Sequence, residues 1–175
     1  MSSADSYRSP LETRYASAEM RGLWSDHRRH ATWRRLWLAL AEAQQQLGLS
    51  ITDEQLDELR AHLDDIDYDA VAAYEKQLRH DVMAHVHALG DVAPNARPIV
   101  HLGATSQFVN CNSELILLCE SLRIIARKTA LIVCALGDFA ARHGERPTLG
   151  FTHFQPAPPT TAGNRAATTP SCTAC

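Results

Sequence analysis

Hydrophobic residues recur at helical spacing along most of the chain, without the strict alternation that a half-buried strand shows. The first predicted helix has Ser25 as its N-cap and ends at Gly48, because glycine is favoured just past a helix end. Its apolar side chains share one face: Trp33, Leu36, Trp37, Leu40 and Leu47. Thr52 and Gln55 have the spacing of a capping box, which predicts a short second helix. The pattern indicates an all-α chain.

A third helix is predicted after the N-cap Asp67, closed by Gly90. Its apolar face comprises Val71, Tyr74, Leu78, Val82, His85 and Leu89. In one continuous helix, Arg79, His80 and Asp81 lie in the interior of the element. Successive helical residues point about 100° apart, so His80 is expected on the side away from the apolar face.

The fourth predicted helix is the longest. From Ser106 to about His143 there is no proline, and the one glycine stands near the far end. Apolar positions alternate spacings of three and four, typical of a bundle seam, over Phe108, Cys111, Leu115, Leu118, Leu122, Ile125, Thr129, Ile132, Leu136, Phe139 and His143. Such a helix is about 55 Å long, whereas a compact chain of this size is only about 40 Å across. We therefore expect the seam to pack against further helices or other subunits.

The texture changes after Pro147. Residues 148–156 are interpreted as a loop with buried aromatic side chains, and residues from 162 onward have no period and few large apolar groups. The predicted organisation is an N-terminal helical domain (1–105), the start of a central bundle domain (106–161) with the long helix and the His153 loop, and a disordered, atypical tail (162–175).

Charge and composition narrow the classes of partner. Seventeen Lys and Arg against 20 Asp and Glu give a net charge of −3, which offers no basic surface for nucleic acid or an anionic membrane. The longest apolar run, residues 130–136, is far shorter than the roughly 18 residues of a membrane span. The first residues lack the basic flank and apolar stretch of a secretory signal. We expect a cytoplasmic protein.

The five cysteines, an odd number, do not suggest a disulfide framework. Cys111, Cys119 and Cys134 stand in apolar helical patterns and are expected to be buried, reduced thiols. Cys172 and Cys175 form a C-x-x-C without a second ligand pair. Structural zinc requires four ligands, so no metal site is predicted there.

Four groups of polar residues are candidates for chemistry. Arg14 with Tyr15 suits a phosphate or carboxylate, since a guanidinium fork binds oxyanions. Arg79, His80 and Asp81 suit anion binding or the positioning of a proton. For both groups the alternative is an ordinary solvated, charged surface.

The other two groups flank the long helix. Thr105 and Ser106 stand at its start, where free N–H groups and the helix dipole favour an anion, although N-capping alone explains them as well. His101 precedes them and is able to line the same pocket. Thr152 and His153 follow the helix, and histidine is suited to proton transfer near neutral pH. The four groups together suggest a polyanionic small molecule and a histidine acid.

Several long strings of the sequence resemble the adenylosuccinate lyase family of the animal type. The strings are residues 9–17, 32–37, 78–87, 101–106 and 147–157, and the resemblance runs from about Tyr7 to Gly163. It implies the all-helical fumarase/aspartase fold, a homotetramer whose central helices form one bundle, and no metal or organic cofactor. The implied reaction is β-elimination of fumarate from adenylosuccinate, giving AMP, and from the succinylcarboxamide ribotide (SAICAR), giving AICAR, in purine nucleotide biosynthesis.

The resemblance also implies roles for the candidate residues. Arg14 and Tyr15 are expected to hold the nucleotide phosphate, and Thr105 and Ser106 the succinyl carboxylates. The substrate site is expected to be lined by Arg79, by His80 in a supporting catalytic role, by Asp81 and by Thr152. The implied general acid is His153.

The chain also departs from the family pattern. The serine base of the family lies in a Ser-Ser-x-Met-Pro type of string that is not found here, and Cys111 stands where an aspartate is expected. After Gly163 the resemblance ends. The leading hypothesis is the N-terminal part of a lyase, inactive alone because the base and the rest of the bundle are missing. The alternative is a non-catalytic helical interaction module that associates with full-length lyase subunits through the apolar seam.

Overall fold

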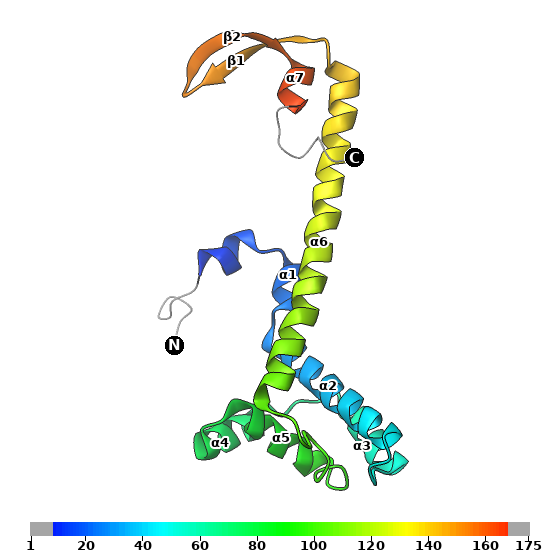
Figure 1. Ribbon diagram of the computed structural model, residues 1–175. Coiled ribbons are helices and arrows are strands. Elements are labelled where there is room, and N and C mark those ends of the chain that lie inside the picture. The colour runs from blue at the N-terminus through cyan, green and yellow to red at the C-terminus, as the bar shows by residue number, and fades with distance from the viewer. Residues whose placement is uncertain (1–8, 168–175) are drawn as a thin grey trace. The chain divides into compact units, whose positions relative to one another are not determined.

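The computed structural model describes residues 9–167 and is built mainly from helices (Figure 1). In chain order the elements are η1 (Leu11–Tyr15, a π-helix), α1 (Ala18–Leu23), α2 (Asp26–Gln46), α3 (Asp53–Ala61), α4 (Tyr68–Leu78), α5 (Asp81–Val92), α6 (Ser106–His143), β1 (Pro147–Thr152), β2 (Gln155–Thr161) and α7 (Ala162–Ala167). Internal contacts divide the chain into two units, one up to Ser121 and one from Leu122 onward, so the boundary falls inside α6. The all-α fold class is confirmed, with one small hairpin in addition.

Local capping signals place α2 and α3 where the sequence predicts them. The hydroxyl of Ser25 accepts the N–H of Arg28 at the start of α2, and Gly48 has the left-handed φ of 93° just past its end. At α3, Thr52 and Gln55 exchange both hydrogen bonds of the capping box. These contacts lie within a few residues of each other, which is why sequence alone is sufficient to predict them.

The core of the first unit forms between α2, α3, α5, the turns of residues 93–104 and the first turn of α6. Its largest fully buried side chains include Trp33, Trp37, Leu59 and Leu89. Leu47, predicted on the apolar face of the first helix, is instead exposed, because the helix ends at Gln46. The two buried tryptophans of α2 therefore hold the centre of this unit.

The predicted third helix is wrong as one element, because it breaks into α4 and α5. Arg79 takes the left-handed conformation (φ 53°), and His80 is extended and caps α5. α4 and α5 then lie side by side (Figure 1), and their buried residues Val71, Ala84 and Ala88 form one cluster. In a continuous helix Val71 and Ala84 would be about 20 Å apart. The break brings the two apolar faces together.

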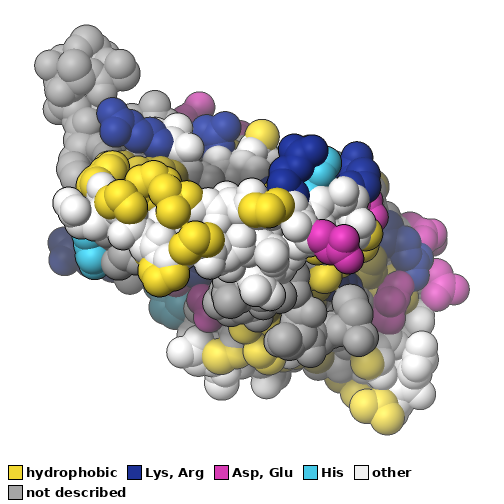
Figure 2. Space-filling model, turned by 90° about the horizontal axis from the view of Figure 1, so that it is seen from above, with side chains coloured by type: hydrophobic (Ala, Val, Ile, Leu, Met, Phe, Trp, Pro, Cys, Tyr) yellow, Lys and Arg dark blue, Asp and Glu magenta, His cyan; other side chains and the backbone are white. Residues whose placement is uncertain are grey.

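Helix α6 has the predicted bounds and is 38 residues long, but its buried face differs from the predicted seam. The buried residues Val109, Ser113, Leu117 and Ser121 follow a spacing of four, and all lie in the first unit. The predicted seam residues Leu115 and Leu118 are exposed there, and Leu122, Ile125, Ile132 and Phe139 are exposed in the second unit. Exposed hydrophobic side chains are also seen on the face in Figure 2.

The expectation of buried thiols is wrong for the cysteines that the structure describes. Cys111, Cys119 and Cys134 are free and exposed, because they lie on faces of α6 that the described chain leaves uncovered. Cys172 and Cys175 lie outside the described residues.

The second unit contains a hairpin where a loop with buried aromatics was expected. β1 and β2 pair antiparallel, with Thr152 opposite Gln155, and Phe151 and Phe154 are exposed. The sequence does not predict this hairpin, because β2 does not alternate between buried and exposed positions and is interrupted by prolines; a two-stranded sheet accepts prolines, since both its strands are edges. In the tail predicted to be disordered, Ala162–Ala167 form α7, and residues 168–175 are outside the described part.

Candidate functional site

The break between α4 and α5, formed by Arg79, His80 and Asp81, exposes three polar side chains. The sequence predicted these residues inside a helix, which the structure corrects: Arg79 is its C-cap and His80 the next N-cap. A left-handed residue other than glycine is uncommon and often marks a functional position. The first turn of α5 starts at Asp81, where the N–H of Val82 donates to Oδ1 of Asp81 at 2.8 Å and that of Met83 donates to His80.

The imidazole of His80 has one nitrogen committed and one free. Nδ1 accepts the backbone N–H of Met83 at 3.3 Å and lies 3.6 Å from Oδ1 of Asp81. A ring nitrogen that accepts carries no proton, so in the neutral ring the proton is on Nε2. The Nε2–H is therefore left as a donor for a ligand.

A second imidazole, that of His101, joins this region from the turns before α6. Its Nδ1 accepts the indole N–H of Trp37 at 2.9 Å, and its own φ is left-handed at 62°. Burial lowers the pKa of His101, and the nearby charge of His80 lowers it further. The two histidines are thus close enough to interact electrostatically. The sequence predicts that His101 lines the pocket of Thr105 and Ser106, and the positive φ of His101 and its partner Trp37 support this.

Thr105 and Ser106 are connected to His101 by a short stretch of turns. Thr105 is exposed, its carbonyl accepts the N–H of Phe108 at 2.9 Å, and Ser106 is partly buried. Four residues span at most about 14 Å, which keeps the first turn of α6 near His101. Its positive dipole end suits an anion, as the sequence predicts.

Arg14 and Tyr15 lie in η1 and are exposed. Among residues 9–167, no hydrogen bond or ion pair joins either side chain to the α4–α5 break or to His101. Their neighbours Leu11, Glu12 and Ala16 line a cavity of about 560 Å³ with α1 and the start of α2. The structure therefore does not bring this predicted pair together with the other candidates.

His153 lies in the second unit, at the turn of the hairpin. His153 and Phe154 are the two turn residues, with left-handed φ values of 48° and 64°, and both side chains are exposed. This geometry is typical of a type I′ turn, which favours Asn and Gly, so a histidine and a phenylalanine are strained there. Thr152 ends β1 directly before this turn.

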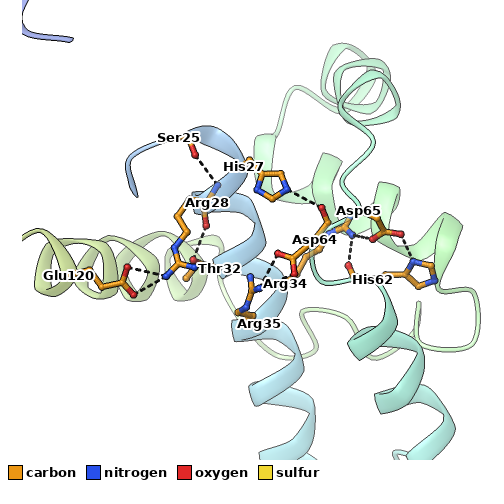
Figure 3. Close-up of polar contacts among 10 residues, drawn as sticks. All are labelled: Ser25, His27, Arg28, Thr32, Arg34, Arg35, His62, Asp64, Asp65 and Glu120. Carbon is orange, nitrogen blue, oxygen red and sulfur yellow. Dashed lines mark hydrogen bonds and ion pairs between the residues drawn. The ribbon is translucent and has the colours of Figure 1, made fainter. Parts of the chain in front are cut away.

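Ion pairs join α2 to the residues that lead into α4 (Figure 3). Arg34 of α2 is only 3% exposed; it donates to the carbonyl oxygen of His62 and to Asp65 at 3.0 Å. Arg35 holds both oxygens of Asp64 at 2.9 Å, and burial lowers the pKa of Arg34. These contacts anchor the loop that leads into α4.

Helix α6 is attached to the first unit by tryptophan and arginine side chains. The indole N–H of Trp24 donates to Ser121 at 2.8 Å, and that of Trp33 donates to Ser113 at 3.1 Å. Arg28 also binds both carboxylate oxygens of Glu120, at 2.9 and 3.0 Å (Figure 3). Helix α2, whose Trp37 binds His101, thereby also holds the first half of α6 through Arg28 and Trp33.

Two classes of site are not found in the part of the chain that the structure describes. Over residues 9–167, no three His, Cys, Asp or Glu side chains gather in a way that would hold a metal ion. Within the same residues, every helix is too short or too polar to cross a lipid bilayer.

Comparison with known proteins identifies close relatives. No protein-family model matches the chain. It is 46% identical over 165 residues to an adenylosuccinate lyase of Schistosoma mansoni and 48% identical over 164 residues to one of Schizosaccharomyces pombe. These matches cover 94% and 92% of this chain and 34% of each relative, so the chain spans about a third of the length of the curated relatives it matches.

Solved structures agree with this assignment. The fold matches a 3-carboxy-cis,cis-muconate lactonizing enzyme from Pseudomonas putida with a TM-score of 0.78 and 28% identity, over 90% of this chain and 37% of that one. It also matches a fumarate lyase from Mesorhizobium sp. with a TM-score of 0.74 and 27% identity, over 87% and 36%. The similarity in sequence and the similarity in fold therefore support the same family assignment.

Proposed function

Because this chain belongs to the adenylosuccinate lyase family and shares the fold of the fumarase/aspartase superfamily, we propose that it forms part of a site that eliminates fumarate from adenylosuccinate, giving AMP, and from SAICAR, giving AICAR. The observation that carries the proposal is 46–48% identity to adenylosuccinate lyases across more than nine tenths of the chain. The nucleotide substrate is small and multiply anionic, in keeping with the exposed polar groups at the α4–α5 break.

The reaction requires an acid, a base and a place for negative charge. A base removes the proton from the carbon beside one succinyl carboxylate, the electrons form the fumarate double bond, and the C–N bond breaks. An acid protonates the departing nitrogen, and donors stabilise the charge that develops on the carboxylate. The electrons balance within the substrate, so no redox partner or cofactor is needed.

His153 is proposed as the general acid. Its imidazole is exposed at the strained turn of the hairpin, where a proton can be delivered to a leaving nitrogen. His80 is proposed in a supporting role, since its Nδ1 is occupied by Met83 and its Nε2–H is free to donate to substrate. His101, whose Nδ1 accepts the indole N–H of Trp37, offers a second Nε2–H of the same kind.

The remaining candidates are proposed to bind the anionic groups of the substrate. Arg79 supplies a cation at the break, and Asp81, whose Oδ1 accepts the N–H of Val82 at 2.8 Å, lines the substrate site next to His80. Thr105 and Ser106 are proposed to hold the succinyl carboxylates at the start of α6, with Thr152 beside the acid. The phosphate is assigned to Arg14 and Tyr15.

A chimaeric enzyme tests this proposal. This chain replaces the matching 164 residues of the Schizosaccharomyces pombe lyase, and fumarate release is followed by the absorbance of its conjugated double bond. Turnover is expected, with a loss of about a hundredfold or more for His153→Ala, the range of a general acid. Sedimentation checks that each chimaera assembles. An assembled chimaera without turnover, or one unaffected by His153→Ala, contradicts the proposal.

We propose that the chain is inactive by itself and requires partners that complete a homotetrameric bundle. The assembled enzyme is proposed to act in the cytoplasm. The purified chain is expected to release no fumarate, because the serine base of the family is not among its residues. Robust turnover by the chain alone would contradict this.

A non-catalytic interaction module is the second candidate, supported by the exposed Leu115 and Leu118 on α6. It predicts that the chain co-sediments with the full-length Schizosaccharomyces pombe lyase. A Leu118→Glu variant is expected to lose that association, and separate sedimentation of the wild-type chain would reject the module.

A further inference from the structure

Two imidazoles that the proposed mechanism does not use are packed against each other between α2 and α5. The ring of His30 on α2 lies 4.0 Å, centroid to centroid, from that of His85 on α5, at an angle of 38°. His85 is only 5% exposed, and Trp33 stands edge-on to both rings at 4.9 and 5.2 Å. We call these two residues the His30–His85 pair.

The pair connects α2 to both helices that flank the break. His85 follows Asp81 by one helical turn on α5. Tyr68, the first residue of α4, has its ring 5.8 Å from His30 and its hydroxyl 3.4 Å from the Nδ1 of His30. Both sides of the break are thus tied to α2 through the same two rings.

The surroundings of the pair favour neutral rings. Burial, followed by the charges of His30, Arg34 and Arg29, lowers the pKa of His85 to about 3, and Asp81 opposes this shift. The pKa of His30 is also lowered, first by burial and then by Arg29 and Arg34, against Asp26 and Asp81. The phenol of Tyr68 is the titratable group that faces the pair from α4. Adding a proton would place a cation beside two arginines.

Besides these rings, α4 is held by contacts with α5: the hydroxyl of Tyr74 donates to Asp91 at 2.8 Å, and its ring stacks on that of His87. Among the residues of α4, all of which the structure describes, only Val71 is buried, and it packs with Ala84 and Ala88 in a cluster separate from the main core. Helices with few buried contacts open at lower free energy than the core. Loss of the ring contacts would therefore release the break before the rest of the unit unfolds.

We propose that the His30–His85 pair positions Arg79, His80 and Asp81, holding α4 and α5 against α2 while both rings are neutral and releasing the break when a ring is protonated. The identity of the ligand at the break rests on the proposed function. The coupling between the His30–His85 pair and the break does not depend on it. His85 acts through the break and is a positioning residue.

Amide hydrogen exchange of the isolated chain tests the proposal without substrate. The reporter is the N–H of Met83, which donates to His80, and the reference is the set of amides in α3. Met83 is expected to open more readily than α3 at every pH. The sign follows from linkage: the open state takes up a proton near the ordinary histidine pKa of about 6.5, and the closed state does not. Below that pH, the opening constant at Met83 should rise at least about tenfold per pH unit.

Two variants separate positioning from general destabilisation. His85→Phe keeps an aromatic ring without a titratable group, so the increase of the opening constant at Met83 should become about tenfold smaller per pH unit. His87→Gln removes a histidine on the same helix that faces Tyr74 and Arg97 instead, and it should keep the wild-type slope. An unchanged slope in His85→Phe, or exchange of Met83 only together with α3, overturns the proposal. Since no turnover is measured, its failure is distinct from failure of the chimaera.

Discussion

The indole N–H of Trp37 donates to the Nδ1 of His101 over 2.9 Å, and this one bond fixes which nitrogen of His101 carries the proton. Trp37 is fully buried on α2, whereas His101 lies at the edge of the core in a left-handed conformation. A core residue thereby determines that His101 presents an Nε2–H donor on its other side.

Trp37→Phe should release the tautomer of His101. The phenyl ring keeps most of the volume but has no donor, so a mixture of Nδ1–H and Nε2–H forms is expected, together with a loss of stability of about 1 kcal/mol. Long-range proton–nitrogen NMR correlations of the imidazole report the tautomer. Trp33→Phe is the control: it loses the bond to Ser113 and should leave His101 as it is. A single Nε2–H form in Trp37→Phe contradicts the role of the indole.

Arg34→Met should destabilise the first unit more than Arg35→Met. Arg34 is buried, and its loss leaves the carbonyl of His62 and one oxygen of Asp65 without their donor. Because Asp65 is half exposed, we expect about 1–3 kcal/mol rather than the larger cost of a fully buried pair. Arg35 forms an exposed pair with Asp64, which is worth less than about 1 kcal/mol. Urea titrations of the two variants measure both values, and equal losses would refute the ranking.

How far the sequence predicts this molecule depends on whether a signal is local. The caps at Ser25 and Thr52 and the bounds of α6 are correct, since a few neighbouring residues determine them. The break at Arg79 was missed because it arises from packing between α4 and α5, and the sequence has no glycine or proline there.

The candidate site shows the same limit. The resemblance singles out His80 and the start of α6, and the structure adds that the charge of His80 helps to lower the pKa of His101. The position of His101 depends on a turn in which His101 and Gly103 both have positive φ. Such a backbone follows from tertiary packing and is not encoded in helical periodicity.

Phe154→Gly should stabilise the hairpin. Phe154 holds a φ of 64° with its side chain 98% exposed, so the ring contributes little packing while its Cβ is strained. Glycine takes this conformation freely, and a gain of about 1 kcal/mol is expected. Amide exchange across the Thr152–Gln155 pair measures it. Phe151→Gly, within β1 and without positive φ, should weaken the hairpin instead; stabilisation by both changes would mean that relief of strain is not the cause.

Two glycines of the second unit should respond to alanine in opposite ways. A Cβ on Gly163 would lie 2.9 Å from the carbonyl oxygen of Gly144, and the N–H of Gly163 donates to that oxygen at 3.1 Å. Gly163→Ala must push the backbone segments of Gly163 and Gly144 apart, and it is expected to cost about 1–3 kcal/mol, the usual range for overpacking. A Cβ on Gly137 meets nothing within 4 Å, and this residue lies inside α6, where alanine is preferred to glycine by about 0.5–1 kcal/mol. Thermal unfolding followed by circular dichroism should therefore shift down for Gly163→Ala and up for Gly137→Ala; a downward shift for both would show that α6 needs its glycine for close packing against another chain.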